Sequence, residues 1–411
     1  MYGAVIGAGV AGISTTHALR RIGISVDLFE QAPEARSTGY QLNVWPNGKY
    51  ALGQIGLLDA LRDSGYGATI HAIVFIDGRT GKTIRRLASR FPGDYQGTSF
   101  YRGDLHKALL QGLMGDPPQC GRTVEAVTND HDRRKVSVRF SSGEVREFDF
   151  VIGADGAHSN LRGQLFPQHQ GFVPCFEALL FGAQVDLKGQ SAGERAFAEQ
   201  LRQGEFVQIG VPGAAAVLSA AGGGRFGVIM PMADPSRARG ISSPEDAKAL
   251  ARELGRAFRD PRVHHAIEVA FWDPGNPLVW HIGDIDPLPR FHIGRIALIG
   301  DAAHAVIPVI GQGANQAFED AMVLARHIGN AGQPDIESAF DRYSAERHTH
   351  VLRLQQRGRR MVRVALSGGL IGHLLSNAMT RLMTQRTFDR QWNYMLRYAI
   401  ADPQCPISAS G

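Results

Sequence analysis

The 411-residue sequence is poor in cysteine and has no long apolar run. Its three cysteines, Cys120, Cys175 and Cys405, follow no disulfide framework, which favours a reducing cytoplasm over secretion. No uninterrupted apolar stretch reaches the roughly 20 residues that a membrane helix needs. The apolar N-terminus has no basic residue before it, and its first arginines are Arg20 and Arg21, so we expect no signal peptide. The sequence therefore predicts a cytoplasmic protein without stable membrane insertion.

The sequence lacks the residues that are characteristic of several functional classes. A net charge of +5 is too small by itself to indicate nucleic-acid binding. The histidines do not have metal-ligand spacing with nearby acids, so no metal is expected. No Gly-x-Ser-x-Gly segment points to a serine nucleophile. A late group of arginines has no accompanying set of aromatic residues for base stacking and is predicted to lie on a solvated helix face: Arg353, Arg357, Arg359, Arg360 and Arg363.

A glycine-rich turn follows the first apolar segment. Gly7, Gly9 and Gly12, with Ala11 before the last, come after an expected strand at 2–6 and open an expected helix. In such a turn the first glycine permits a tight bend, the second lets the backbone approach a pyrophosphate, and the third lets helix and strand pack closely. A second strand ends at Glu30, where a carboxylate can accept hydrogen bonds from ribose hydroxyls. The turn predicts dinucleotide binding and leaves NAD and FAD open.

Strand and helix patterns alternate along the rest of the chain. Four strand-like runs between 176 and 232 predict an antiparallel sheet, because turn residues separate them. The other expected elements are hairpins at 70–87 and 136–148, a helical stretch around 48–64, a helix capped by Asp104, a buried strand at 148–152, a helix at 244–260 starting near Ser242 or Ser243, a buried strand at 295–299, a helix from Gln312 or Ala314 to 328, and helices from 334 onward.

Two later segments repeat the arrangement of a buried strand followed by a glycine and an aspartate. Asp155 and Gly156 follow the strand at 148–152, and Asp301 follows Gly300 after the strand at 295–299. Carboxylates at the C-terminal ends of such strands lie at the crevice where α/β sheets bind ligands. A glycine-rich turn, Gly311 to Asn315, then opens a helix whose N–H groups can face an anion or a carbonyl. Taken alone, the Asp155 segment is more typical of an ordinary capped turn, and the Asp301 segment fits a capped turn and a ligand site equally well.

Together the three motifs resemble those of the class A flavoprotein monooxygenases, the family of p-hydroxybenzoate hydroxylase, salicylate hydroxylase and the tetracycline-inactivating monooxygenases. The resemblance runs from Gly7 to about Arg360 and includes an arginine, Arg102, before a short helix. It implies that FAD is the cofactor and that Pro308, Gly311 and Gly313 lie near the isoalloxazine. The implied cofactor-binding residues are Gly7, Gly9, Ala11, Gly12, Glu30, Arg36, Arg102, Val124, Asp155, Asp301, Gly313, Ala314 and Asn315.

The resemblance also implies a reaction. NADPH or NADH reduces the flavin, O2 adds at C4a, and the hydroperoxide transfers one oxygen atom to an electron-rich substrate, so the cofactor carries out the chemistry. The apolar sheet predicts a hydrophobic, aromatic or polycyclic substrate. The same fold also serves epoxidases and double-bond reductases. Outside flavin chemistry the motifs allow an NAD-dependent dehydrogenase, or a non-catalytic protein stabilised by FAD. Monomer and homodimer stay open.

The expected fold is α/β, with a Rossmann-like FAD-binding domain of the p-hydroxybenzoate hydroxylase type interrupted by an antiparallel sheet. Nucleotide-binding strands occur early, in the middle and late, which fits one interrupted domain better than two in series. The predicted divisions are a FAD-binding domain at 1–67, 101–170 and 280–330, a substrate-binding sheet domain at 68–100 and 171–279, and a C-terminal helical region at 331–411.

Overall fold

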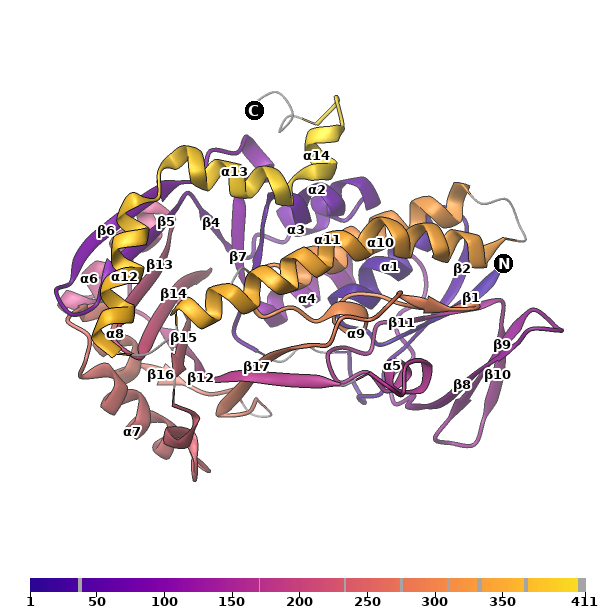
Figure 1. Ribbon diagram of the computed structural model, residues 1–411, viewed down its shortest axis with the longest axis horizontal. Coiled ribbons are helices and arrows are strands. Elements are labelled where there is room, and N and C mark those ends of the chain that lie inside the picture. Colours follow the sequence, from indigo (N-terminus) through magenta and orange to yellow (C-terminus); the bar gives the residue numbers. More distant parts are fainter. Residues whose placement is uncertain are drawn as a thin grey trace.

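A parallel sheet forms one end of the molecule in the computed structural model (Figure 1). The model describes residues 1–35, 39–169, 171–232, 234–273, 276–308, 311–330, 335–365 and 369–405. The strand order is β18-β19-β11-β1-β2, and only the β18–β19 pair is antiparallel. The strands are β1 (Tyr2–Ile6), β2 (Ser25–Phe29), β11 (Phe150–Gly153), β18 (His292–Ile293) and β19 (Ile296–Leu298).

Helices from both ends of the chain pack together beside this sheet. α1 (Val10–Arg21) contacts both α2 (Pro46–Ile55) and α10 (Gly313–Asn330). The central strands are almost completely buried, since β11 has no exposed residue and β1 exposes only Tyr2. Strands covered on both faces need apolar side chains on both, which explains why their sequences do not alternate.

A large, mostly antiparallel sheet forms the other end. Its order is β16-β12-β15-β14-β13-β5-β6, β17 pairs with β12, and β13–β5 is the one parallel pair within it. Three helices cover one face: α6 (Ala192–Gln203), α7 (Pro244–Gly255) and α8 (Pro261–Glu268). The strands are β5 (Ala72–Asp77), β6 (Lys82–Ala88), β12 (Phe172–Gln184), β13 (Glu205–Val211), β14 (Ala214–Gly222), β15 (Arg225–Met232), β16 (Ala270–Phe271) and β17 (Val279–Ile285).

Smaller elements connect the two ends. One three-stranded sheet has the order β3-β7-β4, and another, β10-β9-β8, lies beside the parallel sheet. The remaining elements here are β3 (Gln41–Val44), α3 (Leu58–Asp63), β4 (Ala68–Ile70), η1 (Gly93–Tyr95), β7 (Gly97–Tyr101), α4 (Arg102–Gln111), β8 (Val124–Asp130), β9 (Lys135–Phe140), β10 (Val145–Phe148), α5 (Asn160–Leu165), η2 (Pro235–Ala238) and α9 (Asp301–His304).

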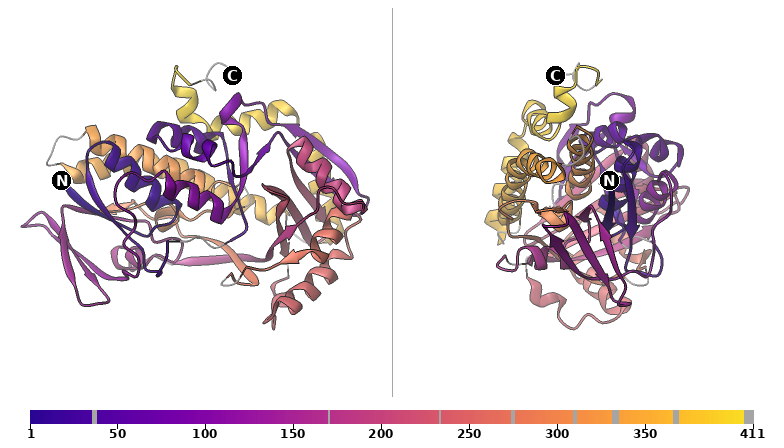
Figure 2. Two further views of the ribbon diagram at one scale, coloured as in Figure 1. Left: turned by 180° about the vertical axis from the view of Figure 1, so that it is seen from behind. Right: turned by 90° about the vertical axis from the view of Figure 1, so that its right-hand side faces the viewer.

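C-terminal helices run along one side of the molecule (Figure 2). The 30-residue α11 (Ile336–Ala365) extends from the parallel sheet toward the large sheet, and α12 (Gly369–Leu382) packs against β6. α13 (Gln385–Met395) and α14 (Arg397–Ala401) follow α12 and are the last helices among the described residues. Among the described residues, no helix is both long and apolar enough to cross a membrane.

Some expectations about the elements are wrong. The helical stretch predicted around 48–64 is helical but divided into α2 and α3, because Gly56 adopts φ +83° and ends α2. Asp104 does not cap α4, which begins at Arg102; it lies in the first turn and pairs with Arg225. The sheet region contains α6, which was predicted as strand or turn. The hairpins and the buried strands are confirmed. The helix predicted at 244–260 is confirmed at its Ser243 cap but ends at Gly255.

Candidate active site

The first glycine turn is tightly packed at two glycines and open at the third. A Cβ atom on Gly7, which has φ +103°, would lie 2.5 Å from the Ala154 carbonyl oxygen. A Cβ on Gly12 would lie 1.8 Å from the Gly7 carbonyl oxygen. No atom lies within 4 Å of the position that a Cβ on Gly9 would take, at the N-cap of α1. The turn therefore leaves open space in front of the free N–H groups of α1.

Glu30 lies beside this turn. One carboxylate oxygen accepts a hydrogen bond from the Ala8 N–H (2.8 Å), and the other accepts one from the Ala32 N–H (2.9 Å). The segment leading to Val124 passes the same point, because the Arg122 N–H donates to the Glu30 carbonyl oxygen. Val124 itself is buried at the start of β8. Arg36 lies outside the described residues.

Asp155 organises its own turn. Its carboxylate accepts hydrogen bonds from the Ser159 hydroxyl (2.6 Å) and from the Leu161 N–H (3.1 Å), so both oxygens cap the start of α5. Ser159 in turn accepts from the Arg162 N–H. This local capping accounts for the position of Asp155 without a ligand, and each oxygen retains a lone pair for one.

Arg162 joins the second motif to the third, although its role was not anticipated from the sequence. Its buried guanidinium donates to the carbonyl oxygens of Ala157 (2.6 Å) and Ala302 (3.2 Å). Burial lowers the pKa of Arg162, and the carboxylates of Asp155 and Asp301 oppose that shift. An arginine shortly after the second aspartate is the only sequence signal that could have indicated this link.

Asp301 presents an unpartnered carboxylate. It is exposed, and the described residues give its side chain no hydrogen bond or ion pair. The preceding Gly300 has φ +55° and lies against Ala11, since a Cβ there would be 3.0 Å from the Ala11 Cβ. On the other side, a Cβ on Gly313 would lie 3.7 Å from the Asp301 carboxylate. The third motif therefore lies directly between the first glycine turn and the start of α10.

The turn before α10 is fixed by Asn315. Its amide nitrogen donates to the carbonyl oxygens of Gly311 (2.8 Å) and Asn43 (2.9 Å), and its amide oxygen accepts from the Trp45 N–H (2.8 Å). Gly311 has φ +61°, and a Cβ there would lie 2.7 Å from the Trp45 indole nitrogen. Pro308 is exposed. The first N–H groups of α10, from Gly313 and Ala314, have no intrahelical acceptor and can serve a ligand.

Several buried polar atoms near β3 have no hydrogen-bond partner among the described residues. They include the side-chain oxygens of Gln41 and Asn43, on one face of β3, and Nε of Arg102. Burial lowers the pKa of Arg102, and the nearby Asp301 carboxylate opposes that shift. Gln41 pairs with Tyr101, the residue before Arg102. Buried polar groups in native proteins are normally satisfied, so this cluster indicates a polar ligand.

These residues form one continuous surface through neighbouring contacts. It runs from Gly9 past Ala11 and Gly300 to Asp301, and then through Gly313 and Asn315 to Asn43, Gln41 and Arg102. It offers N–H donors at a helix N-terminus, the Asp301 carboxylate and the Arg102 guanidinium, and Glu30 lies beside its first turn. These groups match the pyrophosphate, hydroxyls and ring edge of a flavin nucleotide. The residues present thus fit FAD.

An apolar surface faces the turn at Pro308 from the large sheet. Ile307 packs with Phe176 and Ala178 of β12, Ile282 of β17 and Val362 of α11. Leu180, Ile229 and Trp280 lie against the same cluster and are only partly buried. Their neighbours Leu179, Phe181, Val228 and Met230 point to the opposite, helix-covered face. We call Leu180, Ile229 and Trp280 the apolar sheet face.

A separate cavity lies on the other side of β12. Its volume is about 530 Å³, and its lining includes Glu177, Arg239, Leu278 and His281. Glu177 and Ala178 are consecutive, so their side chains leave opposite faces of the strand. None of the residues predicted to bind the cofactor lines this cavity.

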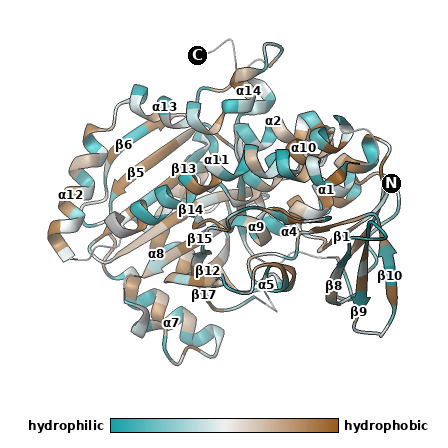
Figure 3. Cartoon of the chain, turned by 45° about the vertical axis from the view of Figure 1, so that its right-hand side comes forward, coloured by the Kyte–Doolittle hydropathy of each residue, from teal (hydrophilic) through white to brown (hydrophobic). Residues whose placement is uncertain are grey.

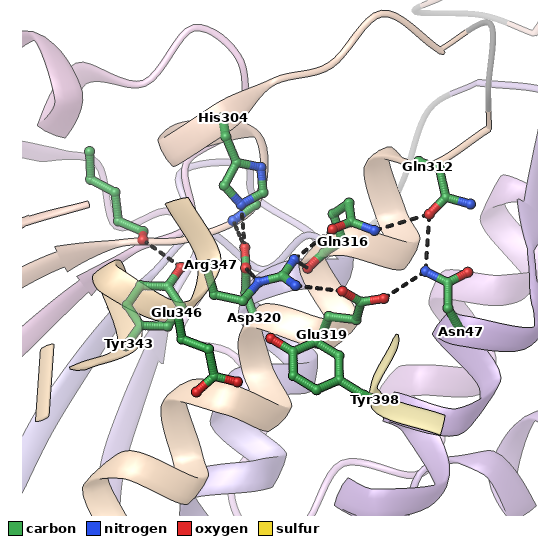
Figure 4. Close-up of polar contacts among 12 residues, drawn as sticks. Asn47, His304, Gln312, Gln316, Glu319, Asp320, Tyr343, Glu346, Arg347 and Tyr398 are labelled. Carbon is green, nitrogen blue, oxygen red and sulfur yellow. Dashed lines mark hydrogen bonds and ion pairs between the residues drawn. The ribbon is translucent and has the colours of Figure 1, made fainter. Parts of the chain in front are cut away.

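A buried ion network supports the third motif (Figure 4). Asp320 accepts hydrogen bonds from the Gly300 N–H (2.8 Å), from His304 (2.6 Å) and from Nε of Arg347 (2.7 Å). Arg347, which is fully buried, also pairs with Glu319. Burial would raise the pKa of the Asp320 carboxyl, but His304, Arg347 and the Gly300 N–H lower it to about 2.

Through its contact with Asp320 this network holds His304 in a structural role. It continues through Glu319 to Asn47, whose amide nitrogen also donates to Gln312. Among the described residues, no group of three or more histidines, cysteines or acids could hold a metal.

Comparison with known proteins gives consistent matches over most of the chain. A family model described as "FAD binding domain" matches residues 3–358. An FAD-dependent urate hydroxylase of Klebsiella pneumoniae subsp. pneumoniae is 31% identical over 361 residues, covering 87% of this chain and 88% of the relative. A 3-amino-4-hydroxybenzoate 2-monooxygenase of Streptomyces cremeus is 29% identical, covering 87% and 86%.

Solved structures share the fold. The Klebsiella pneumoniae HpxO structure, complexed with FAD and uric acid, has a TM-score of 0.78 at 26% identity and covers 96% of this chain and 97% of that one. A salicylate hydroxylase substrate complex has a TM-score of 0.74 and covers 96% of this chain and 95% of that one. Because the two sequences are only 22% identical, this similarity supports the fold alone.

Proposed function

Because the chain belongs to the class A flavin monooxygenases, the FAD-binding family that matches residues 3–358, we propose that it hydroxylates a small hydroxylated or oxo-substituted aromatic or heteroaromatic ring. FAD dependence and aromatic hydroxylation follow from the family, which sets aside the NAD-dependent dehydrogenase considered from the sequence. The observation that carries the proposal is the meeting of the three motifs beside the apolar sheet face.

FAD, when bound, supplies the redox chemistry that activates O2 and transfers one oxygen atom. We propose that the open N-terminus of α1 at Gly9 binds the pyrophosphate and that Glu30 accepts from the adenosine ribose. Asp301 would accept from a ribityl hydroxyl. Gly313, Ala314 and Asn315, at the start of α10, would direct N–H donors to the flavin ring edge and stabilise negative charge there.

The other predicted contacts fill in this site. Gly7, Ala11 and Gly12 hold the turn in place, and Arg102 adds positive charge near the Asp301 end. Asp155 keeps the strand-to-helix turn in position, with Arg162 linking it to Ala302. Arg36 and the backbone of Val124 stay predictions for the adenosine end. Gln41 and Asn43 join the proposal because their side-chain oxygens are buried without partners.

The apolar sheet face is the proposed seat of the substrate ring. Leu180, Ile229 and Trp280 are only partly buried, although they belong to a buried cluster that includes Ile307, next to Pro308. An apolar lining excludes water around the reacting atoms and so protects a reactive intermediate from side reactions. The indole N–H of Trp280 has no hydrogen-bond partner in the part of the chain that the structure describes, and it can donate to a ring substituent.

The names of the relatives support a narrower proposal for the substrate class. They are named for urate, 3-amino-4-hydroxybenzoate and 6-hydroxynicotinate, all small rings carrying oxygen substituents. Such rings are electron-rich, which suits electrophilic oxygen transfer. We therefore favour a compact ring of this kind over a polycyclic substrate, and hydroxylation over epoxidation or double-bond reduction.

We further propose NADPH or NADH as the transient reductant, O2 as the oxidant and the cytoplasm as the place of action. A monomer and a homodimer are both compatible with this function. The proposed division has a discontinuous FAD-binding domain at 1–67, 101–170 and 280–330, and C-terminal helices at 331–411. A sheet domain at 68–100 and 171–279 includes all of β12 to β16, while β17 straddles its end.

A consumption assay tests this function. The FAD-loaded protein is mixed with NADPH or NADH, under air, and with a panel of hydroxylated benzoates, pyridines and purines. At least one ring should accelerate NAD(P)H oxidation and yield a product heavier by one oxygen atom in mass spectrometry. If no ring in the panel gave an oxygenated product while a hydrogenated one appeared, the proposed reaction would be wrong.

A further inference from the structure

The C-terminal helix α12 has its apolar face turned outward. Leu370, Ile371, Leu374, Leu375, Met379 and Leu382 are all exposed, with Ile371 at 76% and Leu382 at 80%. Their spacing places them on one side of the helix, because residues three, four and seven apart share a face. Figure 3 shows these brown turns of α12 at the edge of the molecule. Contiguous apolar surface of this kind is rare on monomers and marks a site of interaction.

The opposite face of α12 is polar and packs inward. His373 is buried. Its Nε2 lies 3.3 Å from a carboxylate oxygen of Asp77, at the end of β5, and 3.1 Å from the side-chain nitrogen of Asn377. Ser376 and Thr380 lie on this side as well. A helix that packs only against its own protein would present the reverse arrangement, with leucines inward. The polar contacts therefore fix α12 in an orientation that keeps its leucines outside.

The sequence on either side of this helix is rich in arginine. Between Val351 and Ala401 the chain has nine arginines and one acidic residue, Asp389. Arg381 is exposed on α12 itself, and Arg386 and Arg390 are exposed on α13, which begins three residues after α12 ends. The formal charge of this segment exceeds the +5 of the whole chain, although Arg359 pairs with Asp284 and Asp286 outside it.

We propose that α12 docks on an anionic lipid surface, with its leucines among the acyl chains and the neighbouring arginines at the headgroups. An apolar helix face flanked by arginines is the arrangement of interfacial membrane-binding helices. At 14 residues α12 is shorter than the roughly 20 that span a bilayer, so it lies in the surface plane. A second copy on this face would bring two arginine-rich rims together, and the like charges would oppose that pairing.

Vesicle co-sedimentation of the FAD-loaded full chain tests the proposal. The vesicles are phosphatidylcholine alone, or phosphatidylcholine with phosphatidylglycerol. The protein should sediment with the anionic vesicles and much less with the neutral ones, and added salt should weaken binding. Replacing Leu374→Glu and Leu375→Glu together should weaken it by about tenfold or more, since two apolar side chains are lost and two negative charges gained.

A matched pair of substitutions controls for the added charge. Met114→Glu and Val145→Glu also replace exposed apolar side chains, far from α12 in the chain, and should leave vesicle binding within about twofold of the parent if α12 is the contact. Flavin absorbance of each variant reports folding. The proposal is overturned if the parent stays in the supernatant with both vesicles, or if the control pair loses binding equally. It is also overturned if the parent is a dimer that only the α12 pair converts to monomer.

Discussion

The carboxylate of Asp320 on α10 lies 2.8 Å from the backbone nitrogen of Gly300 and accepts its hydrogen bond. Gly300 has φ +55° and precedes Asp301, the carboxylate proposed to contact the ribityl chain. A buried charge on one helix thus holds the turn that presents a site residue. Arg347 and His304 make this possible, because a buried carboxylate needs positive partners.

Asp320→Asn should reduce the free energy of unfolding by about 3 kcal/mol, because it leaves the buried Arg347 with one fewer anionic partner. Chemical denaturation of the FAD-loaded protein measures the change. The matched substitution Asp341→Asn removes a carboxylate that is 70% exposed and pairs with His292, and should cost less than about 1 kcal/mol. Equal losses in the two variants would contradict the central role of Asp320.

The Asp320 carboxylate should also make the free energy of unfolding depend on pH in acid. The pKa of Asp320 is lowered in the folded protein to about 2, from 3.8. The stabilisation is therefore fully present above about pH 4 and is lost as the pH falls toward 2, amounting to about 2 kcal/mol. The difference in unfolding free energy between the parent and Asp320→Asn should shrink over this interval. A difference that stayed constant from pH 5 to about pH 2 would show that the carboxylate does not titrate there.

Asp301→Ala should weaken FAD binding by about tenfold or more, because a charged hydrogen-bond acceptor is lost. Equilibrium dialysis of the apoprotein with FAD measures this. The exposed Asp132, in the β8–β9 turn, provides a matched Asp132→Ala control that should bind FAD like the parent. Unchanged affinity in the Asp301 variant would remove that residue from the proposed site.

Gly9→Val should abolish FAD retention by steric exclusion. The space in front of Gly9 is open, and its φ of −75° suits any residue, so the protein should still fold. Gly163→Val is the matched control, since Gly163 also opens onto empty space within a helix but lies outside the proposed site. Flavin absorbance relative to protein absorbance gives the occupancy. Full occupancy in the Gly9 variant would place the pyrophosphate elsewhere.

Ile229→Ala should raise the KM for the aromatic ring by about tenfold, because it removes apolar contact from the sheet face. Val279 is on β17, which also pairs with β12, but it faces the other side of the sheet, so Val279→Ala should leave KM close to the parent value. Steady-state NAD(P)H oxidation measures both. A rise in KM only for Val279→Ala would move the substrate to the opposite face of the sheet.

The sequence predicted those parts of the fold that depend on residues close together in the chain. The glycine turn, the hairpin at Ser141–Gly143 and the capped helix at Ser243 each follow from residues a few positions apart. The sequence interpretation missed several helices, among them α6 and α8. Ser191 with Glu194 forms a capping box that announces α6, and Asp260 before Pro261 caps α8, so both signals were present in the sequence.

Long-range partners could not be predicted in the same way. Asp320 follows Gly300 by 20 positions, and Arg347 follows Asp320 by 27, so their meeting depends on how α10 and α11 pack. Gln41 and Asn43 carry no motif, and only their burial without partners singles them out. The late arginines were all predicted to lie on a solvated face, yet Arg359 pairs with the buried Asp284.

Isotopic labelling with ¹⁸O2 tests the central claim most directly. The FAD-loaded protein, NAD(P)H and an accepted aromatic ring are incubated under ¹⁸O2, and the product is analysed by mass spectrometry. The account predicts a hydroxylated ring that carries one ¹⁸O atom, with none incorporated from H2¹⁸O. A product that took its oxygen from water, or that gained no oxygen at all, would contradict it.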